Sequence, residues 1–199
     1  MEQKIRISQC MIVKDEEKNI RRALSWGKDI MWEQIVVDTG SKDQTPEIAA
    51  RMGATVYHFS WIDDFAAAKN YAIQKAKGDW IVFLDADEYM RPEDTKKLVR
   101  YLESLQKSRY HGLLTSWIQV DGSEAILQDE TGEEKEKLKL HKSIKADGTA
   151  GVALSGTQVR IFRNLERICY QGRIHEKLYV KNGSFFCKDV SRELAVYHT

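Results

Sequence analysis

Residues 78–88 read GDWIVFLDADE, and this stretch decides the fold. Its central residues, 80–84, are all apolar and stand between a glycine and a group of acids. Short apolar runs bounded in this way are typical of β-strands that are covered on both faces. The carboxylates of Asp85 and Asp87 follow directly, where the chain leaves the strand. The stretch therefore predicts a buried strand that brings two acids to one edge of a sheet.

Three further strand-like runs precede this one, and helical patterns separate all four. We predict strands over residues 5–13, 34–38, 54–59 and 80–84. The helices are predicted to begin after the acids at 15–17, at Pro46, at Asp63 or Asp64, and at Pro92. Strands that alternate with helices imply right-handed crossovers and a mainly parallel sheet. The first half, to about residue 95, is thus predicted to be a doubly wound α/β layout that binds a nucleotide.

The spacing of apolar residues also predicts which side of the third helix faces the sheet. We expect an inner face made of Phe65, Ala68, Ala72 and Ala76.

The second half of the chain has a different pattern. Short strand-like runs without long helices between them occupy residues 112–120, 158–163, 168–171, 178–180, 185–187 and 194–197. Residues 121–151 are charged and lack periodicity, so we expect a mobile loop or a short helix over the sheet rather than a linker. We therefore predict one domain over residues 1–199, with a smaller mixed β region from about residue 96.

The composition excludes several classes of protein. The formal net charge is +1, so no overall field favours nucleic acid or an anionic membrane. No apolar run approaches the roughly 20 residues of a membrane-spanning helix, and the N-terminus lacks the pattern of a secretion signal. Cys10, Cys169 and Cys187 are odd in number and widely spaced, so we expect reduced thiols. These features predict a cytoplasmic protein without an integral membrane segment.

Polar groups follow the predicted strands at their carboxyl ends, where open α/β sheets bind ligands. They are Lys14, Asp15 and Glu16 after the first strand, Asp38 and Gly40 after the second, and Asp85, Ala86 and Asp87 after the fourth. The helix that follows the third strand carries Lys69. Because the ends of parallel strands meet at one edge, the pattern predicts one shared site.

The pair Asp85 and Asp87 favours a metal ion at this site. Two carboxylates two residues apart repel each other where a strand end is partly shielded from water. A divalent cation relieves the repulsion, and carboxylate oxygens suit Mg²⁺ or Mn²⁺. The alternative for the pair is a capped turn before Pro92.

Simpler interpretations stay open for the other polar groups. Residues 38–41 fit an ordinary turn, because Gly40 takes positive φ readily and Ser41 or Asp43 can cap locally. Residues 15–17, all acidic, fit acids that complement the dipole of the following helix. Lys69 fits a solvated helix residue.

Six segments together resemble the family 2 inverting glycosyltransferases of the GT-A fold, especially the bacterial branch that is often followed by tetratricopeptide repeats. They are residues 11–20 (MIVKDEEKNI), 35–45 (IVVDTGSKDQT), 64–70 (DFAAAKN), 78–88 (GDWIVFLDADE), 160–164 (RIFRN) and 172–176 (GRIHE). The resemblance implies a GT-A-like fold whose first half binds a nucleotide sugar and whose second half receives the acceptor. It implies a metal-dependent, inverting transfer from a nucleoside-diphosphate sugar, with UDP expected, to a glycan, lipid, peptide or protein.

The resemblance also implies a role for each matching residue. Asp38 is expected to contact uracil or ribose, and Lys14, Asp15 and Glu16 are expected to line the base pocket. Asp87 is expected to bind the Mn²⁺ or Mg²⁺ that bridges the diphosphate, with Asp85 on the ribose or, through water, on the metal. His198 matches a histidine that completes the metal shell in many such enzymes. Gly40, Lys69 and Ala86 fall within the same donor site.

An inverting transferase also needs a base that takes the proton of the acceptor hydroxyl or thiol, and the second half must supply it. Glu176 is the candidate, because residues 174–176 place an acid beside an imidazole. The alternative for this segment is an ordinary polar pair at a strand end.

The chain departs from the family pattern in two places. The family usually has Asn at the position of Asp15 and Arg at the position of Lys69. Lysine keeps the charge but lacks the bidentate fork that suits phosphate, so we expect weaker binding of the diphosphate. The sequence stops one residue after His198, where the family often continues into a helical region. We therefore expect a truncated chain or a catalytic module alone.

Rival functions predict other patterns. A nucleotidyltransferase normally has a glycine-rich, basic loop after the first strand, whereas residues 14–17 read KDEE. A phosphatase with an aspartyl nucleophile normally has its Asp-x-Asp pair after the first strand of its core. A non-catalytic binding or scaffold domain would be favoured by loss of the pair at Asp85 and Asp87, which is intact.

Overall fold

Strand β4 (Trp80–Phe83), the apolar run of the opening motif, lies inside a ten-stranded sheet. The computed structural model describes residues 4–120, 143–145 and 152–199. Four strands run parallel in the order β3-β2-β1-β4, with β1 at Ile7–Val13, β2 at Glu33–Asp38 and β3 at Thr55–His58. The doubly wound layout predicted for the first half is therefore confirmed.

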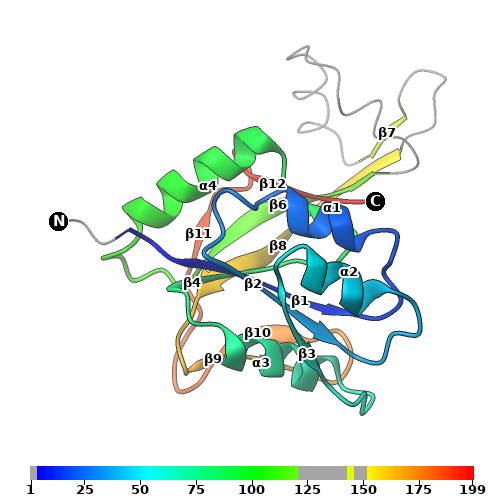
Figure 1. Cartoon of the computed structure of the whole chain (residues 1–199). Coiled ribbons are helices and arrows are strands. Elements are labelled where there is room, and N and C mark those ends of the chain that lie inside the picture. Colours follow the sequence, from blue (N-terminus) through cyan, green and yellow to red (C-terminus); the bar gives the residue numbers. More distant parts are fainter. Residues whose placement is uncertain (1–3, 121–142, 146–151) are drawn as a thin grey trace.

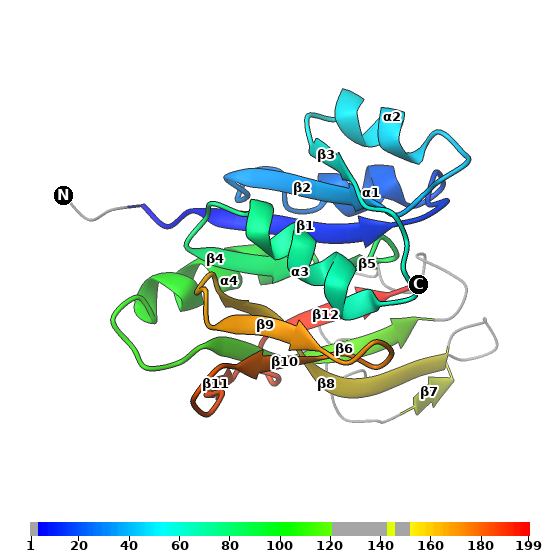
Figure 2. The same cartoon turned by 90° about the horizontal axis from the view of Figure 1, so that it is seen from below.

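Helices cover both faces of these strands. Helix α3 (Phe65–Lys75) lies on one face, and α1 (Ile20–Ser25), α2 (Thr45–Arg51) and α4 (Pro92–Ser104) lie on the other (Figures 1 and 2). Side chains alternate along β1, so that Cys10 belongs to the α3 side while its neighbour Met11 packs with Ile20 of α1. The strands β1, β2 and β4 are therefore mostly buried, as expected for strands covered on both faces, whereas the edge strand β3 is exposed or half-buried.

The second half adds strands of mixed direction. Strand β8 (Val152–Arg163) runs antiparallel between β4 and β6 (Gly112–Val120). Strand β12 (Ala195–His198) is parallel to β6 and antiparallel to β5 (Glu88–Tyr89). Strand β7 (Ser143–Lys145) pairs with β8, and β11 (Cys187–Asp189) pairs with β6. A separate antiparallel pair, β9 (Ile168–Gln171) and β10 (Lys177–Val180), packs beside α3 (Figure 2).

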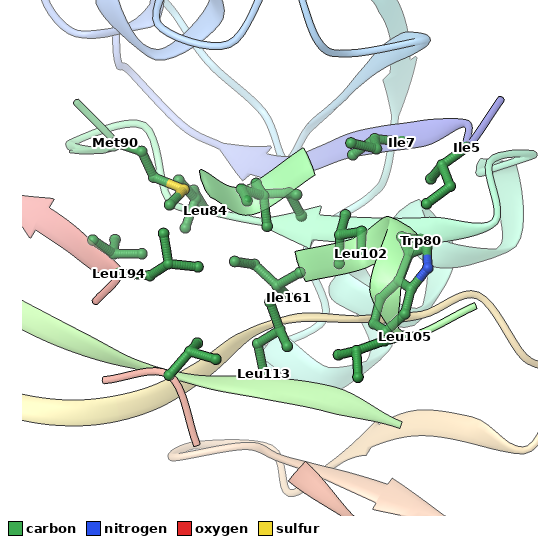
Figure 3. Close-up of a cluster of buried hydrophobic side chains, with 14 residues drawn as sticks. Ile5, Ile7, Trp80, Leu84, Met90, Leu102, Leu105, Leu113, Ile161 and Leu194 are labelled. Carbon is green, nitrogen blue, oxygen red and sulfur yellow. The ribbon is translucent and has the colours of Figure 1, made fainter. Parts of the chain in front are cut away.

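One hydrophobic cluster joins the two halves. Leu102 of α4 and Trp80 of β4 pack there with Leu113 of β6 and Ile161 of β8 (Figure 3). Each is at most 1% exposed, and burying a side chain of this size contributes roughly 1.5–3 kcal/mol. Since strands from both halves share this core, the edge of β4 is held in a fixed position relative to β8 and β12.

Strand boundaries differ from the sequence expectations in several places. Strand β5 was not expected, and β8 begins at Val152 rather than at residue 158, because it pairs with β6 as far as Val120. Strand β11 is shifted by two residues from the expected 185–187. Residues 143–145 form a strand where a loop or short helix was expected, and the rest of 121–151 lies outside the described residues.

The inner face expected for α3 was partly wrong. Phe65 is 41% exposed, and the buried residues of the helix are Ala66, Ala68, Lys69 and Ala72. Phe65 is the first helical residue after the cap Asp64, whose carboxylate accepts a hydrogen bond from the Ala67 amide at 2.9 Å. The helix ends at Lys75, one residue before Ala76.

The cysteines and the membrane expectation can be compared directly with the structure. All three cysteines are described and are free thiols. Burial raises the pKa of Cys10 above its ordinary value and that of Cys187 to about 11, which makes both thiols unreactive. Within the described ranges, no helix has the length and apolar character needed to cross a bilayer.

Candidate active site

A cleft of about 1180 Å³ opens beyond the carboxyl ends of β1 and β4. Of the residues singled out from the sequence, those that line it are Lys14, Glu16, Lys69, Asp85, Ala86, Asp87, Glu176 and His198. Asp15, Asp38 and Gly40 are not among the described residues that line it. The expected convergence of strand ends therefore holds for β1 and β4, whereas β2 contributes Thr39 in place of its acid.

The carboxylate of Asp38 makes its backbone hydrogen bonds within its own turn. Its carboxylate is almost fully buried and accepts hydrogen bonds from the backbone amides of Gly40 at 3.2 Å and Ser41 at 3.1 Å. Gly40 has φ of +110°, a conformation that favours glycine. His58 Nδ1 lies 3.4 Å from Oδ2, the oxygen that also accepts from the Gly40 amide. The turn interpretation thus describes what Asp38 contacts, and its contact with a base or ribose stays a prediction.

The acids at 15–17 join the loop after β1 to the loop after β2 through hydrogen bonds. Asp15 has a left-handed backbone, with φ of 55°, and its carboxylate accepts a hydrogen bond from the Lys42 amide at 2.7 Å. Glu17 accepts one from the Gln44 amide at 3.3 Å. Helix α1 begins only at Ile20 and has no acid in its first turn. The helix-dipole interpretation of these acids was therefore wrong.

Asp85 lies between two cations. Lys69 Nζ is 3.8 Å from its Oδ1, and Arg160 Nη2 is 3.1 Å from its Oδ2. Lys69 is 4% exposed and its ammonium lies 5.3 Å from the ring centres of Phe83 and Tyr170, a cation–π distance. The alternative of a solvated Lys69 was therefore wrong: the lysine is a fixed, buried charge in the floor of the cleft.

Glu88, the last residue of the acidic turn, is completely enclosed by hydrogen-bond donors. Its Oε1 accepts from Arg160 Nη2 at 2.6 Å and from the Trp117 indole at 2.7 Å, and its Oε2 accepts from the Asp85 amide at 2.9 Å. Burial raises the pKa of Glu88 although the charge of Arg160 opposes the shift. Burial lowers the pKa of Arg160, but Glu88 and Asp85 outweigh it and raise that pKa above its ordinary value. Arg160 therefore carries a permanent charge at the base of the cleft.

Asp87 lies beside β12, the last strand of the chain. Because β12 pairs with β5, His198 lies opposite Glu88, and His198 Nε2 is 3.0 Å from Asp87 Oδ2. The imidazole packs on Trp117, with ring centres 5.1 Å apart, and its Nδ1 is buried without a hydrogen-bond partner. The Thr199 amide donates to the Asp87 carbonyl at 3.2 Å. The structure thus brings Asp87 and His198 together, as the sequence predicted.

Glu176 lies on the loop between β9 and β10 and points to Lys69. Its Oε1 is 2.6 Å from Lys69 Nζ, and its side chain is 15% exposed. The loop is held against the start of α3 because the Phe65 amide donates to the Arg173 carbonyl at 3.0 Å. Glu176 is therefore brought to the same floor as Asp85, from the opposite side of Lys69.

The mouth of the cleft near Glu176 is apolar. Trp61, Phe65 and Ile174 line it, and Ile174 is 68% exposed. The rings of Trp61 and Phe65 meet edge to face at 4.8 Å, and Asp63 accepts a hydrogen bond from the Trp61 indole at 2.9 Å. The cleft therefore has a charged floor and an apolar rim.

Sequence reasoning assigned no role to Arg160, Glu88, Trp117 or Tyr170. A usable signal existed for Arg160, because it is a charge beside the apolar pair of residues 161 and 162 in an expected strand. Glu88 follows the acidic pair directly, but its burial depends on β5, a strand of two residues that no pattern indicates.

Comparison with known proteins supports one family. Residues 8–161 match the sequence model described as "Glycosyl transferase family 2". The crystal structure of TarS 1-349 from S. aureus superposes with a TM-score of 0.58 over 98% of this chain and 60% of that chain, at 15% sequence identity. TarS 1-349 in complex with UDP-GlcNAc gives a TM-score of 0.52 over 93% of this chain and 58% of that chain, also at 15% identity. The fold is the GT-A fold that the resemblance implied.

Two curated relatives are closer in sequence but longer. A TPR repeat-containing protein of Synechococcus elongatus is 55% identical over 82 residues, which are 41% of this chain and 20% of the relative. An uncharacterized glycosyltransferase of Rickettsia typhi is 35% identical over 105 residues, which are 53% of this chain and 36% of the relative. The aligned part of this chain thus spans about a third or less of either relative. Since the family model covers most of the chain, the protein belongs to glycosyl transferase family 2.

Proposed function

We propose that this chain transfers a sugar from a UDP-sugar to an acceptor hydroxyl or thiol, with inversion at the anomeric carbon and with the help of Mn²⁺ or Mg²⁺. The observation that carries the proposal is the arrangement of charges on the cleft floor. Three carboxylates, Asp85, Asp87 and Glu176, line it together with the cations Lys69 and Arg160, and Glu88 is buried against Arg160.

Asp87 is the carboxylate of this group that does not face a lysine or an arginine. Asp85 and Glu176 each face one, whereas the side-chain partner of Asp87 among the described residues is His198. A diphosphate beside Asp87 would be repelled in a partly desolvated cleft, so it needs a further cation there. The arrangement therefore supports a donor that binds together with a metal ion.

Asp87 and His198 are the residues that would hold the ion. Their facing atoms, Oδ2 and Nε2, are 3.0 Å apart, about the separation of neighbouring ligands around an ion with bonds of about 2.1 Å. Among the described residues there is no ready group of three or more His, Cys, Asp or Glu side chains for a metal. A two-residue site is usual for ions that take their other ligands from water and phosphate. The bound ion would stabilise the negative charge that develops on the leaving diphosphate.

Asp85 does not share in this pair, because Lys69 and Arg160 flank it. It fits the other role implied by the family, an acceptor of hydrogen bonds from the ribose. Asp38 shapes the turn that carries Thr39 into the cleft beside Lys14 and Glu16, and these residues would border the base.

Glu176 would act as the base. In a single displacement, the acceptor oxygen or sulfur attacks the anomeric carbon while the bond to the diphosphate oxygen breaks, and the acceptor proton passes to the carboxylate. Lys69 holds Glu176 by a 2.6 Å ion pair and so fixes its direction. The apolar rim of Trp61, Phe65 and Ile174 adjoins Glu176 and would cover the acceptor from water.

A solved structure of similar fold suggests which ligands to test, and the cysteines bear on the cellular location. TarS has been crystallised with UDP-GlcNAc, so UDP and UDP-GlcNAc are the first ligands to try. The free cysteines are what a reducing compartment maintains, which supports the cytoplasmic location expected from the sequence.

Thermal unfolding with nucleotide tests the proposal. UDP and UDP-GlcNAc should each raise the melting temperature when Mn²⁺ is present and should have little effect when EDTA replaces it, since a ligand that binds only the folded chain stabilises it. ADP serves as the matched control for the base. Equal shifts with Mn²⁺ and with EDTA would contradict the metal requirement, and equal shifts with UDP and ADP would contradict a uridine donor.

A further inference from the structure

We infer that Arg160 is a further donor-binding residue, whose guanidinium contacts the diphosphate, and that the buried carboxylate of Glu88 positions it. The inference rests on the proposed function, because it assigns a residue to the same donor site. Neither the family resemblance nor the comparisons give a role to Arg160 or to Glu88.

The first observation is the place of Arg160 in the cleft. It lines the floor from β8, and its Nη2 approaches Oδ2 of Asp85 while Lys69 approaches Oδ1. The two cations therefore stand on opposite sides of one carboxylate. A diphosphate that lies over Asp85 and reaches Asp87 would meet both of them.

The second observation is that the guanidinium has unused donors. Both carboxylate contacts of Arg160 are made by one nitrogen, Nη2, instead of by the two-nitrogen fork that arginine offers to an anion. Its Nε is buried without a hydrogen-bond partner, and no bond of Nη1 joins it to another described residue. Nη1 is therefore the nitrogen of this guanidinium that remains for an acceptor that the described residues do not supply.

The third observation is the enclosure of Glu88. Its side chain is 0% exposed, and three donors hold it: Arg160, the Trp117 indole and the Asp85 amide. A buried ion pair adds little net stability compared with an apolar pair of similar size, because both charges lose their water. A gain in stability therefore does not account for this pair. The pair is better explained by its effect on Arg160, whose charged group it holds at a fixed place in the cleft.

Arg160 also compensates for the departure from the family pattern at Lys69. A lysine stands where the family usually has arginine, and lysine lacks the fork that matches phosphate oxygens. Arg160 lies on the other side of Asp85 and brings Nη1 of a planar guanidinium to the same floor, since Nη2 already bonds Asp85 and Glu88. We therefore expect the phosphate contacts of the donor to be shared between a point charge at Lys69 and a planar donor at Arg160.

Binding of UDP compared with uridine tests the assignment, because the two ligands differ only in the diphosphate. UDP affinity in Mn²⁺ is measured by calorimetry, and weak uridine binding by ligand-observed NMR. Arg160→Lys should weaken UDP about 10-fold, and the double variant Glu88→Gln with Arg160→Met about 100-fold, while uridine binding stays unchanged. The double variant removes both members of the buried pair, so it leaves no lone buried charge to prevent folding.

Glu88→Gln alone tests positioning. Glutamine keeps an acceptor for Trp117 but gives up the charge that anchors Arg160, so UDP binding should weaken a few-fold and uridine binding should not change. Lys177→Met is the control for charge alone, since Lys177 is an exposed lysine that lines the same cleft. It should change UDP affinity less than about 2-fold.

The possible results distinguish a failure of the Arg160 assignment from a failure of the proposed function. If wild type binds UDP but Arg160→Lys and the double variant bind it within 2-fold of wild type, the assignment of Arg160 is overturned and the proposed function stands. Equal loss of UDP and uridine binding would show that the pair is only structural, which also overturns the assignment. If wild type binds no UDP in Mn²⁺, the proposed function falls and takes this inference with it.

Discussion

The acids at the ends of β1 and β2 and the acids at the end of β4 lie at one edge of the sheet, but they have different partners. Asp15 and Asp38 accept hydrogen bonds from backbone amides of the 40–42 turn. Asp85 and Glu88 face the side-chain cation Arg160, and Asp87 faces His198. The first group is part of the local fold, whereas Asp85 and Asp87 of the second group line the cleft and Glu88 is buried against Arg160.

The two groups of acids differ in the hydrogen bonds that each would lose when a ligand binds. A carboxylate held by backbone amides cannot change partner without opening its turn, and the amides would then lose their acceptor. A carboxylate held by a side chain can exchange partners by small rotations. We therefore expect substitutions in the first group to lower the stability of the fold, and substitutions in the second group to lower activity.

Asp87→Ala should have one of the two largest effects, together with the substitution of Glu176. Removal of the carboxylate takes away one of two side chains that would hold the metal, so turnover of the UDP-sugar should fall about 100-fold or more. The melting temperature should change little, since Asp87 is partly exposed. Initial rates of UDP release and a thermal scan measure the two quantities. Asp29→Ala, at an exposed acid outside the cleft lining, is the control and should leave both as in wild type.

Glu176→Gln should lower transfer about 100-fold to 10,000-fold, the usual range for loss of a general base. Affinity for UDP should remain near that of wild type, because glutamine still offers Lys69 an acceptor oxygen and the other proposed donor contacts come from Arg160 and the turn after β4. The check is single-turnover transfer together with calorimetric binding of UDP. Loss of UDP binding along with transfer would show that Glu176 belongs to the donor site and is not the base.

Asp38→Ala should act mainly on stability. The substitution leaves the amides of Gly40 and Ser41 without their charged acceptor, and the free energy of unfolding should fall by about 1–3 kcal/mol. Urea denaturation measures this directly. Asp38→Asn keeps an acceptor oxygen and should recover part of the loss. A stable Asp38→Ala protein that binds UDP poorly would break the comparison, since it would place Asp38 with the second group.

The smallest effect should come from Asp15→Asn. Asparagine tolerates the left-handed backbone at φ of 55° and keeps the oxygen that accepts from the Lys42 amide. The free energy of unfolding should stay within about 0.5 kcal/mol of wild type. A clear change in UDP affinity without a change in stability would show that the charge of Asp15 acts on the donor.

The sequence was a good guide wherever one strand and its own turn decide the structure. The run of residues 80–84 predicted β4, and the two acids after it lie at the cleft as expected. Local apolar patterns determine such strands, and parallel order brings their ends together.

The rest depends on pairing between distant segments. Strand β5 exists because β12 arrives beside it, and only this pairing brings His198 to Asp87. Burial of Lys69 depends on the β9–β10 pair, whose loop supplies Glu176. Arg160 lies in an apolar strand, and its partner Glu88 is 72 residues away in the chain. No local pattern indicates which distant charges will meet.

Uptake of Mn²⁺ followed by electron paramagnetic resonance tests the central claim most directly, because free Mn²⁺ gives a signal that is lost on binding. We expect the wild-type chain with UDP to remove most of the free signal, and the protein or UDP alone to remove much less. Asp87→Ala combined with His198→Ala should abolish the cooperative uptake. Uptake with UDP that is the same in the double variant as in wild type would contradict a metal-bridged donor held by Asp87 and His198.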